Sequence, residues 1–378
     1  MKWVLTKTAM DYEVRMLRQS NNVQTYVFGV GAAATLAEKI RQRREAGADP
    51  RVVFLIDSYF RTFDIEARFF VRSGDLVIWV DTVEEPSTIA IDSYVQRVRV
   101  DFSEQQNPCA ILGIGGGIAL DSAKALSNLL TNGGIAENYQ GWDLLKVPGV
   151  YKIGVPTLSG TGAEASRTCV LTNKAKNIKL GMNSAFSVFD HLVLDPVFSE
   201  TAERNQYFYT AMDTYIHCVE SLQGSYRHAL ADAYSVQAIR LIREVCDSKD
   251  MMTLENREKV MVASYLGGAS IANTYVGVVH PLSAGLSTVL HTHHCIANCL
   301  VMNVMDDFYP AHVEEFRGFL KKQQISLPSA ICKNLSSGDF QNLYDSMIIH
   351  EKPLINALGP EFKNILSFEK VTGIFRLI

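Results

Sequence analysis

The first half of the chain alternates short apolar, β-branched runs with segments of helical periodicity, and this alternation limits the folds open to it. We predict buried strands at 51–57, 75–81, 109–115 and 152–157, with helical patterns such as those at 33–46 and 87–100 between them. Strands that alternate with helices form a parallel sheet whose two faces are both covered. We therefore expect an α/β domain with a parallel sheet in this half.

The pattern changes after Asp195 and Pro196. The segments that follow carry apolar residues three and four positions apart, with few strand signals, at 200–223, 228–246, 254–275 and 280–308. A chain of 378 residues is long enough to form two domains. We expect an α/β N-terminal domain at 1–196 and an all-α C-terminal domain at 197–378.

The composition argues against several functional classes. A net charge of −4 gives no general attraction to nucleic acid or to anionic membranes. Lys7 and Asp11 interrupt the apolar run at the N-terminus, so we expect no signal peptide, and no stretch is long enough to span a bilayer. The seven cysteines form no CxxC pair, which favours reduced thiols in a cytoplasmic protein. Cys295 and Cys299, four positions apart, are interpreted as two small packed side chains.

Two glycine-rich loops in the first half are candidate phosphate-binding loops. Gly29, Gly31 and Ala34 have the G-x-G-x-x-A spacing of a dinucleotide fingerprint, but a tight strand–helix turn explains the same spacing and is favoured. The second loop, at 115–117, consists of three glycines between a predicted strand and a helix. Three glycines leave backbone N–H groups uncovered at a helix N-terminus, where pyrophosphate binds, so this loop is predicted to bind phosphate.

A third loop, at 156–164, and the aspartate that ends the strand at 51–57 extend the predicted cofactor crevice. Thr157, Ser159 and Thr161 offer small hydroxyl groups at the carboxyl end of a strand, where ligands of parallel sheets bind. Asp57 can accept hydrogen bonds from a ribose diol or can cap the next helix, and both interpretations stay open. In the first case its charge repels a 2′-phosphate, so we predict NAD rather than NADP.

The helical half carries candidate metal ligands. Asp213 and His217 lie one helical turn apart and face the same way, so they can hold one ion or hydrogen-bond each other. Glu220 is either a partner of this pair or a solvated charge. His280 and His294 are 14 positions apart, about 21 Å on one straight helix. Both reach one ion only if the helix ends and the chain folds back, and Thr292 with the flanking histidines is the candidate break.

Together these motifs resemble those of the metal-dependent alcohol dehydrogenase family often called iron-containing, whose relatives include glycerol dehydrogenase and dehydroquinate synthase. The resemblance covers nearly the whole chain and includes FGVG at 28–31, GGGIALDSAK at 115–124, PTLSGTGAE at 156–164 and the D-x-x-x-H at 213–217. It implies a dehydroquinate synthase-like architecture in which the α/β domain binds NAD(P) and the helical domain holds one divalent metal. Fe²⁺ and Zn²⁺ both suit one carboxylate and three imidazoles.

The resemblance also assigns roles to individual residues. The implied metal ligands, which form the catalytic centre, are Asp213, His217, His280 and His294. His294 is chosen because CIAN follows it, as GxAN follows the last ligand in relatives, so His291 and His293 are not expected to bind metal. The implied cofactor-binding residues are Asp57, Gly115, Gly116, Gly117, Asp121, Thr157, Leu158, Ser159, Thr161 and Lys179. A homodimer is expected from the same resemblance.

Two positions depart from the family pattern. Many relatives have a histidine, often credited with proton relay, four residues after the position of His280, and here that residue is Ala284. A methyl group cannot carry a proton, which leaves His291, His293 or a ribose hydroxyl as alternative carriers. Many relatives also have glycine directly after the last ligand, where this chain has Cys295.

The function implied by the resemblance is oxidation of a primary alcohol to an aldehyde. The metal acts as a Lewis acid on the substrate hydroxyl, and hydride passes to the nicotinamide ring. The stretch 139–173 is similar to the 3-deoxy-D-manno-octulosonate 8-oxidases, which act on the terminal alcohol of this lipopolysaccharide sugar and make oxygen a second candidate acceptor. The alternatives are another alcohol or polyol dehydrogenase, a dehydroquinate synthase-like cyclase, and a non-catalytic nucleotide-binding protein, which would not need an intact ligand set.

Overall fold

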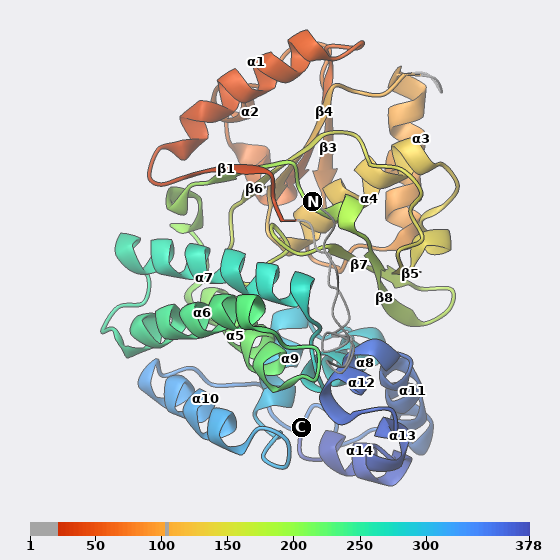
Figure 1. Cartoon of the computed structure of the whole chain (residues 1–378), viewed down its shortest axis with the longest axis vertical. Helices are drawn as coiled ribbons and strands as arrows, with labels where there is room; N and C mark the ends of the chain where they lie inside the picture. The colour runs from red at the N-terminus through yellow and green to blue at the C-terminus, as the bar shows by residue number, and fades with distance from the viewer. Residues whose placement is uncertain (1–21, 103–105) are drawn as a thin grey trace, which may run out of the picture.

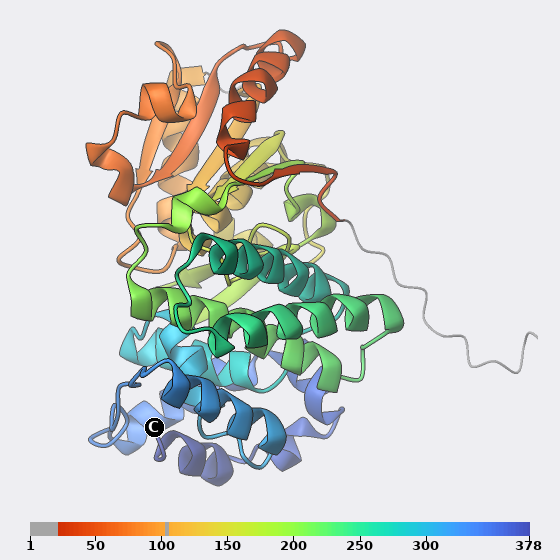
Figure 2. The same cartoon turned by 90° about the vertical axis from the view of Figure 1, so that its left-hand side faces the viewer.

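The computed structural model describes residues 22–102 and 106–378, so the N-terminal run that carries Lys7 and Asp11 lies outside the described residues. A parallel sheet with its helices occupies one end of the molecule, and a helical domain occupies the other (Figures 1 and 2). The sheet has the strand order β1-β9-β6-β4-β2-β3, and every pairing in it is parallel. Its strands are β1 (Thr25–Phe28), β2 (Val52–Asp57), β3 (Leu76–Val80), β4 (Ala110–Gly115), β6 (Lys152–Pro156) and β9 (His191–Leu194).

Helices cover both faces of this sheet, as the alternating sequence predicts. Side chains of β2 alternate between two cores: Val53 and Leu55 pack beneath α3 and α4, whereas Phe54 and Ile56 pack on the side of α1 and α2. Because both faces are buried, the strand reads as one continuous apolar run. The helices of this domain are α1 (Leu36–Ala46), α2 (Ile65–Phe69), α3 (Thr88–Phe102) and α4 (Gly117–Asn132).

A second, three-stranded sheet is a feature that the sequence analysis did not predict. It has the order β5-β8-β7, and β7 and β8 form an antiparallel hairpin. The strands are β5 (Gly141–Trp142), β7 (Thr168–Asn173) and β8 (Ile178–Asn183). Only alternate residues of β7 are buried, so its sequence lacks the continuous apolar run that identifies the strands of the main sheet. Figure 1 shows this small sheet on the side of the α/β domain that faces α8 and α12.

Within the described residues no strand follows β9, which confirms the predicted helical second half. Its helices are α5 (Arg204–Gln223), α6 (Ala229–Asp247), α7 (Leu254–Asn273), α8 (Val279–Leu290), α9 (His294–Met302), α10 (Pro310–Lys322), α11 (Ser337–Ile348), α12 (Glu351–Leu358), α13 (Phe362–Ile365) and α14 (Phe368–Phe375). Every residue of α5 from Tyr207 to Ser221 is buried, so α5 lies at the centre of this domain. We keep the domain boundary at residue 196 as a proposal.

The predicted break between the candidate histidine ligands is present. A helix ends at Leu290, His291 adopts a left-handed conformation with φ of 54°, and a new helix begins at His294. The segment 280–308 is therefore two helices rather than one. Cys295 and Cys299 are both buried in the core of the helical domain, as small packed side chains. No helix among the described residues is both long enough and apolar enough to cross a membrane.

Candidate active site

A cavity of about 820 Å³ is lined by residues of both domains. The α/β domain contributes Asp57, Gly116, Gly117, Asp121, Thr157, Leu158, Thr161 and Lys179, and the helical domain contributes His217, His280, Ala284, His293 and His294. The structure thus brings most of the predicted cofactor and metal residues to one place. Gly115, Ser159 and Asp213 are exceptions, because none of them is among the residues that line the cavity.

The triple-glycine loop presents bare backbone to the cavity at the N-terminus of α4. Gly116 is the N-cap and Gly117 is the first helical residue. A Cβ atom at Gly117 would lie 3.0 Å from the hydroxyl of Thr161, so a side chain there would be crowded by the neighbouring loop. Uncovered N–H groups and the positive end of the helix dipole make this corner suitable for a phosphate group.

The loop at 156–164 is fixed to two helices of the other domain. Thr214 of α5 donates a hydrogen bond of 2.6 Å to the carbonyl of Gly160. The hydroxyl of Ser264 on α7 accepts from the backbone N–H groups of Gly160 and Gly162 at 2.7 and 3.2 Å, and donates to Glu164 at 2.6 Å. A Cβ at Gly160 would lie 1.9 Å from the carbonyl oxygen of Thr210, so only glycine allows this close approach. The loop is therefore a point of attachment between the two domains.

Asp57 serves as a helix cap and also lines the cavity. Its Oδ1 accepts from the backbone N–H of Tyr59 at 2.9 Å and from the hydroxyl of Thr82 at 3.1 Å. Oδ2 receives no hydrogen bond from the described part of the chain and is free to accept one from a ligand. Burial raises the pKa of this carboxyl. The two interpretations of Asp57 are therefore compatible.

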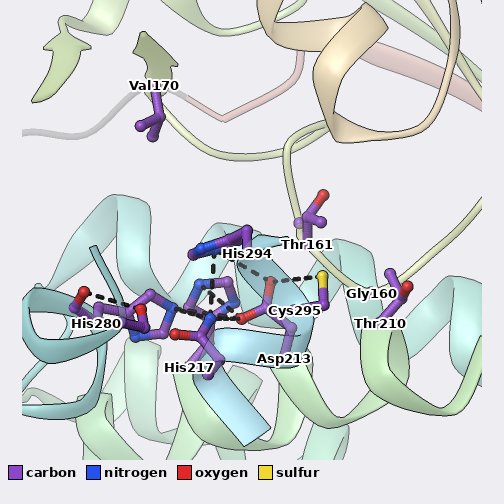
Figure 3. Close-up of polar contacts among 12 residues, drawn as sticks. Gly160, Thr161, Val170, Thr210, Asp213, His217, His280, His294 and Cys295 are labelled. Carbon is purple, nitrogen blue, oxygen red and sulfur yellow. Dashed lines mark hydrogen bonds and ion pairs between the residues drawn. The ribbon is translucent and has the colours of Figure 1, made fainter. Parts of the chain in front are cut away.

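Three predicted metal ligands converge on the helical side of the cavity. Asp213 comes from α5, His280 from α8 and His294 from the start of α9, and their donor atoms all lie within 4.8 Å of one another. The His280 and His294 Nε2 atoms are 3.3 and 3.7 Å from the Asp213 carboxylate. The break after α8 brings the two histidines together. Figure 3 shows these side chains gathered below the loop that carries Gly160 and Thr161.

His217, the fourth predicted ligand, lies beside this group but is not part of the three-residue cluster. Its Nε2 is 3.8 Å from Asp213 Oδ1, and its ring stacks on that of His280 at a centroid distance of 4.4 Å. The side chain also lines the cavity. Its role as a ligand stays a prediction.

The charges of Asp213, His217 and His294 suit a cation. Burial raises the pKa of the Asp213 carboxyl, but the imidazoles of His217, His294 and His280 together outweigh burial and hold that pKa well below its ordinary value. Burial lowers the pKa of His217 to about 4 and that of His294 to about 3. At pH 7 the carboxylate is therefore ionised and these two imidazoles are neutral, which are the protonation states that metal ligands need.

Glu220 is a buried partner of His280 and not a solvated charge. One of its carboxylate oxygens contacts His280 Nδ1, and the other accepts from the backbone N–H of Val279 at 2.6 Å. Burial lowers the pKa of His280, but the Glu220 and Asp213 carboxylates outweigh burial and raise it to about 9. A carboxylate on the far nitrogen of a ligand histidine fixes the ring and directs its other nitrogen at the metal.

Two further residues support the cluster, and the sequence analysis gave neither of them a role. Asn298, one turn after His294, is buried and donates to Asp213 Oδ1 at 2.6 Å. Glu85, in the loop after β3, accepts from the backbone N–H of His294 at 3.2 Å and pairs with Lys179 at 3.1 Å. Burial opposes ionisation of Glu85, but Lys179 and His294 outweigh it and lower its pKa to about 2. The spacing of Asn298 from His294 was a usable signal, whereas nothing in the local sequence marks Glu85.

Other predicted residues lie elsewhere or are already paired. Gly29, Gly31 and Ala34 form the turn after β1 and do not line the cavity, so the tight-turn interpretation holds. Asp121 lines the cavity but pairs with Lys124 at 3.4 Å. Of the alternative proton carriers, His293 lines the cavity, and its Nδ1 is buried without a partner in the described residues. His291 is exposed and does not line the cavity.

Comparisons with known proteins agree with this arrangement. Residues 24–196 match the model of the iron-containing alcohol dehydrogenases, and residues 207–321 match the C-terminal model of the Fe-containing alcohol dehydrogenase family. The chain is 30% identical over 283 residues to the NAD-dependent methanol dehydrogenase of Bacillus methanolicus, and the match covers 73% of this chain and 72% of that one.

Solved structures share the whole fold. The crystal structure of a 1,3-propanediol oxidoreductase has a TM-score of 0.78 at 20% identity and covers 95% of this chain and 99% of its own. The sulfoacetaldehyde reductase of Bifidobacterium kashiwanohense, solved with NAD⁺, has a TM-score of 0.76 at 17% identity, with coverages of 94% and 99%. Together with the family models and the methanol dehydrogenase, these matches show that the chain is an oxidoreductase that belongs to the iron-containing alcohol dehydrogenase family.

Proposed function

We propose that the protein oxidises a primary alcohol to an aldehyde and transfers the hydride to NAD, using a divalent metal held by Asp213, His217, His280 and His294. The observation that carries this proposal is the shared cavity. One wall is the bare backbone at the start of α4, and the other holds the imidazoles of His280 and His294, whose donor atoms lie within 4.8 Å of the buried Asp213 carboxylate. A nucleotide bound on the first wall would have its reactive end beside the cluster on the second.

The donor set fits Fe²⁺ or Zn²⁺. A bound divalent cation supplies Lewis acidity, which lowers the pKa of a substrate hydroxyl. The chain's own residues prepare the site for it. Glu220 holds His280 by its Nδ1, Asn298 holds the Asp213 carboxylate, and Glu85 holds the backbone of His294. Each of these contacts fixes a ligand before the substrate arrives.

The cofactor residues have distinct roles in this proposal. The N–H groups at Gly116 and Gly117 receive the pyrophosphate, and Asp57 Oδ2 accepts from the adenine ribose. Thr157, Leu158 and Thr161 form the wall that faces the metal cluster, with Lys179 beside it. The names of two similar proteins support NAD, since one is an NAD-dependent methanol dehydrogenase and another was solved with NAD⁺.

As the specific substrate we propose the C8 hydroxyl of 3-deoxy-D-manno-octulosonate, with other alcohols or polyols as the broader class. The support is the similarity of 139–173 to the enzymes that oxidise this sugar, because this stretch supplies eight of the residues that line the cavity. The relatives' names include methanol, 1,3-propanediol and sulfoacetaldehyde, so the family's pockets admit varied small substrates. A cytoplasmic homodimer is part of the same proposal.

The test is a panel of primary alcohols, including this sugar, 1,3-propanediol and methanol, given to protein loaded with Fe²⁺ or Zn²⁺ and NAD. NADH absorbance and oxygen uptake are followed together. We expect NADH to form with at least one alcohol and only in the presence of metal. Failure of every alcohol with both metals would contradict the proposal, whereas oxygen uptake without NADH would move the electron acceptor from NAD to oxygen.

A matched pair of variants tests the ligand assignment. We expect His294→Asn to lose the metal and the activity, and His291→Asn to keep both, because His291 is exposed and outside the cluster. Asparagine suits the left-handed conformation at 291. Metal content is measured on the purified proteins. The opposite result for the two variants would refute the assignment of His294.

A further inference from the structure

One end of the cavity is built from groups that neither the metal cluster nor the proposed cofactor wall uses. The start of α12 and the residue before it line this end through His350, Glu351 and Lys352. Trp142 of the small sheet and Tyr275, which follows α7, line the cavity there as well. We refer to these five residues as the α12 corner.

His350 brings an unused polar atom to this corner. Its Nε2 is buried and has no partner among the described residues. A buried polar nitrogen without a hydrogen bond is costly, and such atoms commonly receive a ligand or a water. Burial and the nearby Lys179 and His280 lower the pKa of His350 to about 4, so the ring is neutral and carries one N–H that it can donate.

Lys352 places a positive charge at the rim of the same corner. Its Nζ lies 4.2 Å from the centroid of the Trp142 ring, and Trp142 in turn meets Tyr275 edge to face at 5.0 Å. The acidic neighbours of this lysine are engaged elsewhere: Glu351 pairs with Lys363 at 3.1 Å, and Asp143 pairs with Arg167. The ammonium group is therefore available to an anion in the cavity.

We infer that the α12 corner binds an anionic group of the substrate, so that the substrate is a hydroxy acid whose carboxylate contacts Lys352 and His350 while its primary alcohol reaches the metal cluster. A carboxylate takes a charge-assisted hydrogen bond from the ammonium group and a second bond from the imidazole. Trp142 and Tyr275, which also line the cavity, contact the carbon chain between the two ends. This inference rests on the proposed function, because it assumes that the alcohol carbon lies at Asp213, His280 and His294.

The probes are D-gluconate and D-glucitol, which have the same six carbons and a primary alcohol, and differ in a carboxylate at one end. Each is titrated into metal- and NADH-loaded protein, in which no oxidation can occur, and the dissociation constants are measured by calorimetry. We expect gluconate to bind about tenfold more tightly than glucitol, because one bond to a charged group is worth about that factor. Equal binding, tighter binding of glucitol, or no binding of gluconate would overturn the inference.

Variants locate the source of the preference. Lys352→Gln and His350→Asn are expected to reduce the preference for gluconate to about twofold or less. Lys322→Gln, an exposed lysine on α10 that does not line the cavity, is the control and should keep the preference. A preference that survives both corner variants, or that falls equally in the control, would place the anion elsewhere and refute the assignment.

This design separates the inference from the proposed function. If no alcohol yields NADH but gluconate still binds in a Lys352-dependent way, the proposed reaction fails and the anion site stands. If neutral alcohols are oxidised and the calorimetry shows no preference for gluconate, the reaction stands and the anion site is refuted.

Discussion

Ser264 offers a test of whether hydrogen bonds or packing alone hold the loop at 156–164 to the helical domain. Its hydroxyl is fully buried, accepts from the N–H groups of Gly160 and Gly162, and donates to Glu164. Ser264→Ala removes one atom and leaves three buried polar groups without this partner. The substitution barely changes side-chain volume, so any large effect comes from the lost hydrogen bonds.

The magnitude follows from the number of partners lost. A buried polar group left without a hydrogen bond costs about 1–3 kcal/mol, and partial relaxation of the loop recovers some of the total for three groups. We expect Ser264→Ala to lower the free energy of unfolding by about 3 kcal/mol. The affinity for NAD should fall as well, because the loosened loop also carries Thr157 and Thr161.

Ser287 provides the matched control. It is also a buried serine in a helix of the same domain, but its hydroxyl has no partner among the described residues, and it does not line the cavity. Ser287→Ala should therefore not lower the free energy of unfolding, because it removes a buried hydroxyl that has no hydrogen bond to lose. Urea unfolding followed by tryptophan fluorescence compares the two variants with the parent protein, and NAD titration reports on the loop. Equal losses of stability in the two variants would refute the hydrogen-bond account.

Three further substitutions test the cofactor preference, the metal affinity and the pH dependence of stability separately. Asp57→Gly should weaken NAD binding and improve NADP binding, because a carboxylate near the adenine ribose repels a 2′-phosphate; an unchanged affinity ratio would make Asp57 only a helix cap. Glu220→Gln should lower metal affinity about 10- to 100-fold in a chelator competition, because the buried carboxylate no longer holds His280, and unchanged affinity would deny that role. Burial lowers the pKa of His191 from 6.5 to about 4. Between these pH values the unfolded chain binds a proton that the folded chain does not, so acid favours unfolding. The contribution of His191 to the free energy of unfolding, up to about 3 kcal/mol, is present above pH 6.5 and lost as the pH falls toward 4. His191→Gln should make the free energy of unfolding less dependent on pH over this range. An unaltered slope would show that other groups cause the pH dependence.

The fold was predictable where an element is buried in a way that gives its sequence a simple apolar pattern. Strands β2, β4 and β6 are buried on both faces and appear as continuous apolar runs, so their positions were predicted to within a residue or two. β9 is only four residues long, and β7 is buried on one face, so neither produced a recognisable run. The small sheet was missed for this reason, although it supplies Trp142 and Lys179 to the cavity.

The candidate site was predictable for residues that share a local motif and not for those that only tertiary structure brings together. Asp213 and His217 are one helical turn apart, and the break at His291 follows from the distance between two histidines on the chain. Glu85 lies more than 200 positions from His294 in the sequence, and its contact depends on how the two domains pack. The same is true of the α12 corner, whose residues come from three separate segments.

The adjacency of Asp213 and Thr214 on α5 has a consequence for binding. Asp213 faces the metal cluster, whereas Thr214 donates to the carbonyl of Gly160 in the cofactor loop. Any shift of this helix turn on metal binding therefore reaches the loop through one hydrogen bond. We expect the metal to strengthen the binding of NAD, and NAD to strengthen the binding of the metal. Thermodynamic linkage requires that metal change the NAD affinity by the same factor as NAD changes the metal affinity. Thr214→Val keeps the side-chain shape and removes the donor, so this factor should fall toward one while Asp213 stays in place. Titrations of each ligand with and without the other measure it, and a factor near one in the parent protein, or one that Thr214→Val leaves unchanged, would show that the two sites act independently.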